Sequence, residues 1–267
     1  MTERVAIASL GAVGRVIARQ VSEKLPEYRL SAVTARRLDR ARDFVRSHGL
    51  AADVVGLERI SENADIVIEC APAQVYREIA EPVIESGKTL ITLSVGALLD
   101  HWDLVDVARA TGGRILVPSG AILALDAVQG VSEGVVHSVR MVTRKPLAGL
   151  RGAPFLERQG IDLDHVTEPT LLFEGTAREA VSGFPANLNV SVALSLAGVG
   201  PDKTFIEVWA DPTVEHNTHR IQVDSDSAKL DFTIQNIPSE NPATGRLTPL
   251  SVVALLRKLA SPLQIGT

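Results

Sequence analysis

The chain has one cysteine, Cys70, which excludes an internal disulfide framework and is typical of a reducing cytoplasm. Aromatic residues make up only 4% of it and the net charge is −5, so a nucleic-acid partner is not expected. No apolar run approaches the roughly 20 residues that cross a bilayer. The first apolar stretch starts almost at the N-terminus, which leaves no room for a signal peptide. These absences predict a cytoplasmic protein with no membrane partner.

The chain has 267 residues, of which 45% are hydrophobic, enough for two modest lobes or one large α/β domain. Its first 120 residues alternate between short apolar runs and amphipathic stretches. That alternation predicts a doubly wound parallel sheet with right-handed crossovers. The expected strands lie near residues 5–8, 30–34, 52–55, 64–70, 89–93 and 114–117, and the expected helices near 15–25, 38–47, 76–86 and 98–111.

The pattern changes beyond residue 120. Strands are expected near 135–143, 171–174, 203–210, 220–223 and 229–237, and most of them have no helix between them. This pattern favours a second α+β domain with a mixed or antiparallel sheet. Its principal helix is expected at residues 187–197, and a last helix at 250–259 would return to the first domain. The predicted domains are therefore residues 1–120 and 121–241, with a C-terminal helix in 242–267.

The turn after the first strand carries the clearest motif. Gly11, Ala12, Val13 and Gly14 follow an apolar strand and open a helix, as in the G-x-G-x-x-G turn that binds a dinucleotide pyrophosphate. Gly11 and Gly14 take the second and third glycine places, and Ser9 stands in the first. The alternative is an ordinary strand-to-helix turn of another doubly wound domain.

The tip of the second strand bears on the choice of nicotinamide cofactor. A carboxylate there binds the ribose 2′-hydroxyl of NAD, whereas an arginine accommodates the 2′-phosphate of NADP. The sequence is Thr34-Ala35-Arg36-Arg37, without a carboxylate. Arg36 and Arg37 therefore favour NADP, and NAD is not excluded. The alternative is a solvated basic loop.

Loops that follow the later strands of a parallel sheet line its ligand crevice. Cys70 and Ala71 end one such strand, and Ser94 and Ser119 follow the next two. Cys70 has no neighbour in the sequence that would activate a thiolate nucleophile, so a small buried residue beside the cofactor is expected.

Two histidines, His216 and His219, lie in a segment expected to be a loop between strands. A neutral imidazole takes up a proton near pH 7, so either one suits general-base catalysis. Their spacing also allows a metal pair with Asp211 or Glu215, but Pro212 makes a helical ligand face doubtful, and no metal is expected. A surface or structural role is the remaining alternative.

Two asparagines, Asn187 and Asn189, lie at the start of the expected helix 187–197. Asparagine at a helix start is usually a cap. The functional alternative is an amide that faces the carboxamide of nicotinamide.

Several segments together resemble the L-aspartate dehydrogenase family over essentially the whole chain. They are Glu69-Cys70-Ala71, Ser94-Val95-Gly96-Ala97, Pro118 to Ile122 with Leu125-Asp126-Ala127, Thr143 to Pro146, Phe184 to Val190 with Ala193 to Gly198, Ala210-Asp211-Pro212 with Asn217-Thr218-His219, and Asn236 to Pro242.

The resemblance implies a Rossmann domain, a second α/β domain over the nicotinamide, and a returning C-terminal helix. It also implies oxidation of L-aspartate with NAD or NADP to iminoaspartate, which hydrolyses to oxaloacetate and ammonia. Iminoaspartate also feeds NAD biosynthesis. By position, His219 matches the family's active-site histidine. Asn189 and an alanine of the 120–124 loop, Ala124 or else Ala121, match cofactor-binding positions.

The substrate has two carboxylates, which need cationic or amide partners. Candidates are Arg144, Lys145, Asn187 and Arg246, which the sequence does not rank. A homodimer is expected because two-fold dimers are the commonest oligomers. Two alternatives remain open, a two-domain dehydrogenase of the homoserine or dihydrodipicolinate type and a non-catalytic NAD(P)-sensing protein.

Overall fold

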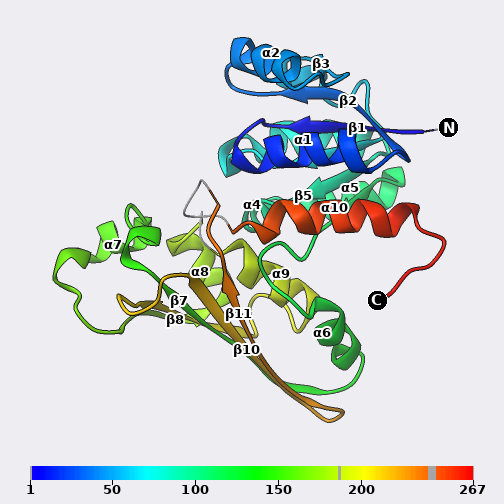
Figure 1. Ribbon diagram of the computed structural model, residues 1–267. Coiled ribbons are helices and arrows are strands. Elements are labelled where there is room, and N and C mark those ends of the chain that lie inside the picture. The colour runs from blue at the N-terminus through cyan, green and yellow to red at the C-terminus, as the bar shows by residue number, and fades with distance from the viewer. Residues whose placement is uncertain (1, 186–187, 240–244, 267) are drawn as a thin grey trace. The chain divides into compact units, whose positions relative to one another are not determined.

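The computed structural model describes residues 2–185, 188–239 and 245–266. The chain divides into two compact units. Unit 1 contains residues 1–120 and 248–264, and unit 2 contains residues 121–247 and 265–267. Figure 1 shows the elements of both units in order along the chain.

Unit 1 is built on a parallel sheet of six strands in the order β3-β2-β1-β4-β5-β6. This strand order is that of the doubly wound dinucleotide-binding fold, whose ligand crevice lies where the order reverses, between β1 and β4. The predicted parallel sheet is confirmed. The strands are β1 (Glu3–Ala8), β2 (Tyr28–Thr34), β3 (Asp53–Val54), β4 (Ile66–Glu69), β5 (Thr89–Thr92) and β6 (Arg114–Leu116).

Helices cover both faces of this sheet. On one face, α1 (Ala12–Lys24), α2 (Leu38–Ser47) and α10 (Leu247–Ala260) share one core with β1 and β2. Val252, Val253 and Leu256 bring α10 into that core, although more than 120 residues separate it from β6. On the other face, α3 (Tyr76–Glu85) packs against α5 (Asp103–Thr111) and the strands. Val5 to Ala8 of β1 form a continuous buried apolar run because both faces of the sheet are covered.

The prediction of a single helix at residues 98–111 is wrong. The chain instead forms α4 (Val95–Asp100) and α5, with a break at His101 and Trp102. The His101 ring stacks on Tyr76 at a centroid distance of 6.0 Å. Asp103 and Asp106 lie in the first turn of α5, where acidic side chains favour a new helix start.

Unit 2 is built on a mixed sheet of five strands in the order β11-β10-β7-β9-β8. Only β7 and β9 are parallel, and the other pairs are antiparallel. The predicted mixed sheet is confirmed. The strands are β7 (Val136–Lys145), β8 (Thr170–Thr176), β9 (Thr204–Ala210), β10 (Asn217–Ser225) and β11 (Lys229–Asn236).

One face of the mixed sheet carries the helices α6 (Leu125–Ser132), α8 (Ala177–Gly183) and α9 (Asn189–Ala197). The short helix α7 (Pro154–Gln159) packs on α8. Only α9 was expected, because the other three have eight residues or fewer and carry little periodicity. The sequence does contain one signal for the start of α8, because Thr176 and Glu179 have the spacing of the capping box that they form. Among the described residues, no helix is both long and apolar enough to span a bilayer.

Candidate functional site

The turn between β1 and α1 is closed by Gly14. A Cβ atom on this residue would lie 2.0 Å from the Ser9 carbonyl oxygen, so only glycine fits without movement. At Gly11, by contrast, the nearest atom to an added Cβ is the Ser9 hydroxyl at 4.0 Å. The surface over Gly11 is therefore open, as a pyrophosphate at the start of α1 requires.

Ser9 takes the first glycine place of this motif, and its φ of +93° lies where side chains are rarely found. Two contacts hold the strained residue. Its backbone N–H donates to the Thr34 carbonyl at 3.2 Å, and its own carbonyl accepts from the Cys70 thiol at 3.2 Å. The backbone needed for the turn is thus present without glycine.

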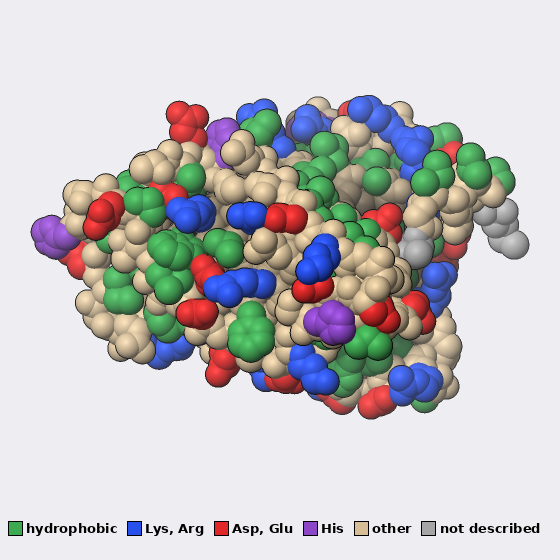
Figure 2. All heavy atoms as spheres, turned by 90° about the horizontal axis from the view of Figure 1, so that it is seen from below, with side chains coloured by type: hydrophobic (Ala, Val, Ile, Leu, Met, Phe, Trp, Pro, Cys, Tyr) green, Lys and Arg blue, Asp and Glu red, His purple; other side chains and the backbone are tan. Residues whose placement is uncertain are grey.

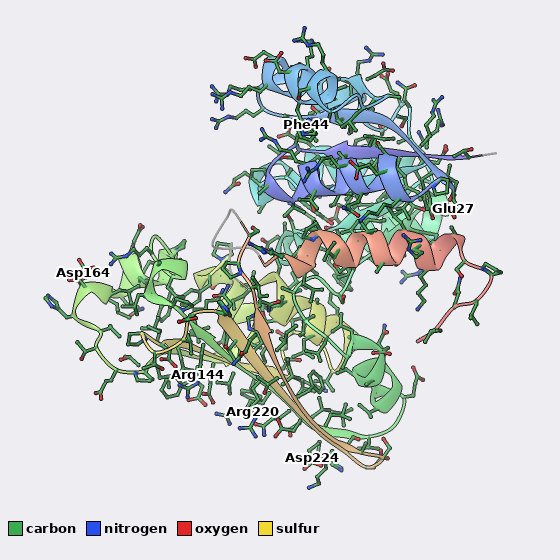
Figure 3. The ribbon with its side chains drawn as sticks, in the orientation of Figure 1. Glu27, Phe44, Arg144, Asp164, Arg220 and Asp224 are labelled. Atoms are coloured by element: carbon green, nitrogen blue, oxygen red, sulfur yellow. The ribbon has the colours of Figure 1, made fainter. Side chains whose placement is uncertain are left out.

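A pocket of about 180 Å³ opens beside this turn, between the ends of β1 and β2. None of the residues that line it is acidic. Arg36, Arg37 and Arg40 are exposed there, and among the described residues none of the three forms an ion pair. Arg15 is held differently, donating to the Leu10 carbonyl at 3.0 Å and lying over the Phe44 ring. Figure 3 labels Phe44, which packs in the core of unit 1. The sequence argument missed Arg40, which lies in the first turn of α2.

Cys70 lies at the end of β4 and is not a candidate nucleophile. Burial, and then the nearby Glu69 carboxylate, raise the pKa of its thiol far above the ordinary value. The thiol donates to carbonyls of the glycine turn instead. Cys70 is half-buried, and its place beside the cofactor stays a prediction.

Glu69 holds together the two loops that follow β4 and β5. Its carboxylate accepts from the Ala71 amide at 2.8 Å, the Ser94 amide at 2.9 Å and the Ser94 hydroxyl at 2.9 Å, with further donors from Thr92 and Leu93. Burial raises the pKa of Glu69, and these donors oppose the rise. The sequence argument quoted Glu69 only as part of a motif and did not foresee this role.

The alanines of the 120–124 loop belong to unit 2. Ala124 has φ +56°, a left-handed conformation, and stands as the N-cap of α6. The Ala121 carbonyl accepts from the side-chain amide of Asn236 at 2.8 Å. Asn189 is the first residue of α9, and Asn187 lies outside the described residues.

His219 lies inside β10, so the prediction that it lies in a loop is wrong. It is 3% exposed, and its Nδ1 lies 3.2 Å from the Thr143 hydroxyl, directly opposite on β7. Burial, together with the positive charge of Lys145, lowers the pKa of His219 to about 3. The imidazole is therefore neutral at physiological pH.

Lys145 and Arg144 are neighbours in sequence and lie on opposite faces of the sheet. Lys145 is 2% exposed and shares the helix-covered face with Thr143. Arg144 donates to the Asp211 carboxylate at 2.9 Å and lies over the Trp209 ring, on the face without helices. Figure 3 shows Arg144 and Arg220 on the side of the sheet away from α9. Arg144 is thus occupied, and on the other face from His219.

His216 precedes β10, and its buried Nδ1 atom has no hydrogen-bond partner among the described residues. No group of three or more His, Cys, Asp or Glu side chains suited to a metal occurs within the described ranges. Arg246, the last candidate for a substrate carboxylate, donates to the Pro238 carbonyl.

The order of the strands and the glycine turn define unit 1 as a dinucleotide-binding domain of the kind found in dehydrogenases. Each of the two units is also matched by a family model. "Homoserine dehydrogenase, NAD binding domain" matches residues 10–118, and "Aspartate dehydrogenase, C-terminal" matches residues 126–259.

Two curated relatives match nearly the full chain. The L-aspartate dehydrogenase of Bradyrhizobium diazoefficiens is 54% identical over 99% of this chain and 94% of its own. L-aspartate dehydrogenase 3 of Bordetella bronchiseptica is 53% identical over 98% and 97%. The crystal structure of aspartate dehydrogenase from Thermotoga maritima covers 100% of both chains with a TM-score of 0.77 at 24% identity, which shows the shared fold.

The chain belongs to the L-aspartate dehydrogenase family. The expected family, the two-part α/β fold, the oxidoreductase class and a nicotinamide cofactor, NAD or NADP, are thereby confirmed. The roles of individual residues remain predictions.

Proposed function

We propose that this chain oxidises L-aspartate with NAD or NADP to iminoaspartate, which hydrolyses to oxaloacetate and ammonia. The observation that carries the proposal is 54% identity, over 99% of the chain, to a relative named L-aspartate dehydrogenase. Iminoaspartate is also a precursor suited to NAD biosynthesis, so the reaction serves either aspartate breakdown or cofactor supply.

Unit 1 would hold the cofactor. The open backbone at Gly11 and the first turn of α1, with Ala12 and Val13, suit the pyrophosphate. Gly14 keeps that turn close to β1, and Cys70 and Ala71 lie at the neighbouring strand end. When bound, the cofactor would supply the acceptor for the hydride of the substrate Cα–H bond. In unit 2, Ala121, Ala124 and Asn189 remain our candidates for contact with the cofactor.

NADP would be the better cofactor. The pocket at the end of β2 has Arg36 and Arg37 and, in addition, Arg40, with no acidic residue in its lining. A 2′-phosphate would meet three guanidinium groups there, whereas the 2′-hydroxyl of NAD would meet no carboxylate acceptor.

His219 would act on the imine. In the tautomer that carries its proton on Nδ1, the imidazole would donate to the Thr143 hydroxyl and leave Nε2 as an acceptor for the attacking water. The two substrate carboxylates bring negative charge that raises the pKa of the imidazole while substrate is bound, so that it can take the proton of that water. Thr143 is then a positioning residue.

Lys145 shares the covered face with His219 and would contact the substrate, whereas Arg144 is bound to Asp211 on the other face. Asn187 remains a candidate for the substrate from its place in the sequence alone.

A homodimer would form through the face of the mixed sheet that carries no helices. Phe205 is 52% exposed and Leu171 is 41% exposed on β9 and β8. Around them lie ion pairs of Arg140 with Glu207 and of Arg220 with Asp231. Figure 2 shows hydrophobic side chains among basic and acidic ones on the surface it presents.

The single cysteine fits a cytoplasmic location.

The test is the absorbance at 340 nm of purified protein with L-aspartate and either NAD or NADP at alkaline pH. We expect turnover with L-aspartate and none with D-aspartate, glutamate or homoserine, and a lower KM for NADP than for NAD. Turnover of homoserine instead would place the chain with the homoserine-type enzymes. Cofactor binding without turnover of any of these would favour a sensing protein.

A further inference from the structure

Glu69 is a fully buried carboxylate that the proposed oxidation does not use. It is the last residue of β4 and is 0% exposed. Burying a charge costs free energy unless hydrogen bonds replace the lost water. Here three backbone amides and two hydroxyls donate to the carboxylate. The site is therefore built to hold this side chain in one position.

The two carboxylate oxygens of Glu69 serve different loops. Oε1 accepts from the backbone N–H of Ala71 at 2.8 Å, in the loop that follows β4. Oε2 accepts from the backbone N–H groups of Ser94 at 2.9 Å and Leu93 at 3.2 Å, in the loop that follows β5. The Ser94 hydroxyl lies 2.9 Å from Oε1 and 3.1 Å from the Ala71 carbonyl oxygen. A glutamine has one acceptor oxygen, so it could hold one loop in this way and not both.

Both loops lie at the carboxyl ends of strands in the second half of the unit 1 sheet. In a doubly wound fold the dinucleotide lies across these strand ends, and each half of the sheet takes one mononucleotide. The glycine turn and the arginine pocket belong to β1 and β2, and so to the adenine half. The ends of β4 and β5 are left for the nicotinamide half.

The two loops are accessible to a ligand, and Glu69 is not. Pro72 is exposed, and Ala71 and Ser94 are partly exposed. A bound cofactor would therefore contact the loops, whereas the Glu69 carboxylate supports them from inside the fold.

We propose that Glu69 is a positioning residue for the nicotinamide half of the cofactor and acts through the loops after β4 and β5. The inference rests on the nicotinamide cofactor of the proposed function. A buried polar network with every member hydrogen-bonded holds a single geometry. The loops thus keep their binding shape before the cofactor arrives and lose less conformational freedom when it binds.

A residue that only stabilises unit 1 would behave differently. Its loss would weaken binding of both halves of the cofactor, because both need the folded unit. Loss of a residue that positions the loops after β4 and β5 should weaken binding of the nicotinamide half alone. ADP carries the adenosine and pyrophosphate that NAD and NADP share, so it probes the adenine half. The fluorescence of the reduced nicotinamide ring reports the other half.

The experiment compares the wild type with Glu69→Gln, Thr92→Val and Asp65→Asn. Thr92→Val removes a hydroxyl that donates to Glu69 at 3.0 Å, and Thr92 is 0% exposed, so it cannot contact the cofactor. Asp65→Asn is the matched control. The Asp65 carboxylate stands just before β4, at the opposite end of the same strand, and accepts from the backbone N–H of Arg4 at 2.9 Å and from its guanidinium at 2.8 Å.

Each protein is titrated with the reduced cofactor, NADPH or NADH, that the wild type binds more tightly, and with ADP by calorimetry. In Glu69→Gln the Kd of the reduced cofactor should rise about tenfold, the effect of one lost hydrogen bond to a charged group, while the Kd of ADP stays within about twofold. The enhancement of nicotinamide fluorescence at saturation should also fall. Thr92→Val should change both readouts in the same direction by less. Asp65→Asn should bind both ligands as the wild type does.

Equal weakening of reduced-cofactor and ADP binding in Glu69→Gln would overturn the proposal, because it indicates a general loss of structure. So would unchanged cofactor binding and fluorescence in Glu69→Gln and Thr92→Val. Urea unfolding shows whether each variant is folded, and Thr92→Val decides the question if Glu69→Gln is not. A wild type that binds the reduced cofactor and does not oxidise L-aspartate would contradict the proposed function itself, whereas the titrations would still test Glu69.

Discussion

The buried neutral His219 should make the stability of unit 2 unusually sensitive to acid. In the folded protein its pKa is about 3, against 6.5 for the ordinary side chain. Between these values the unfolded chain binds a proton that the folded chain does not. The stability contributed by neutral His219 is therefore fully present above about pH 6.5 and is lost as the pH falls toward 3.

The magnitude follows from the two pKa values. At pH 4, the histidine is almost fully protonated in the unfolded chain and almost fully neutral in the folded one. The free energy of unfolding is then about 3 kcal/mol lower than at neutral pH because of this residue. A domain of this size has a total stability of about 5–15 kcal/mol, so the loss should be easy to measure. Carboxylates also titrate in this range, so the effect must be taken as a difference from a variant without the imidazole.

The assay is urea unfolding at pH 7.5 and pH 4 of the wild type and His219→Asn. Trp209 lies in β9 of unit 2, and Trp102 lies in unit 1, so a Trp102→Phe background makes fluorescence report unit 2 alone. The wild type should lose about 3 kcal/mol more than His219→Asn between the two pH values. His137→Asn, an exposed histidine on β7, serves as the control and should behave as the wild type. Equal losses in the wild type and His219→Asn would refute the buried neutral imidazole.

Three further predictions concern other parts of the structure. Gly14→Ala should destabilise unit 1 by about 1–3 kcal/mol in urea unfolding, because its Cβ would lie 2.0 Å from the Ser9 carbonyl oxygen. Gly11→Ala is its matched control and should change stability little while raising the KM for the cofactor. Arg36→Ala and Arg37→Ala should each raise the KM for NADP about tenfold, the effect of one charge-assisted hydrogen bond, and leave that for NAD within about twofold; equal effects on both cofactors would remove these residues from 2′-phosphate recognition. Glu69→Gln should lower the free energy of unfolding by about 2 kcal/mol, because the NH₂ group of glutamine would face an N–H or O–H donor of Ala71 or Ser94. An unchanged unfolding midpoint in urea would contradict this expectation.

Periodicity in the sequence was enough to predict the two kinds of sheet. The strands of unit 1 are short apolar runs bounded by breakers, and period-2 alternation in Phe205 to Trp209 is visible without any tertiary information. The amphipathic helix α2 was predicted with the bounds that the structure shows. The short helices α6, α7 and α8 were missed, because 8, 6 and 7 residues carry too little periodicity to stand out.

The sequence by itself determined the family and the glycine turn, since each segment that carries them is short and continuous along the chain. Only the tertiary structure decided which side chains share a face and which are buried. Register places Thr143 opposite His219, and pleating separates Lys145 from Arg144. Removal from water then sets the chemistry, because desolvation turns an ordinary histidine and lysine into a neutral imidazole and a weakly basic amine. That physical effect depends on segments distant in sequence packing together, and no local pattern contains it.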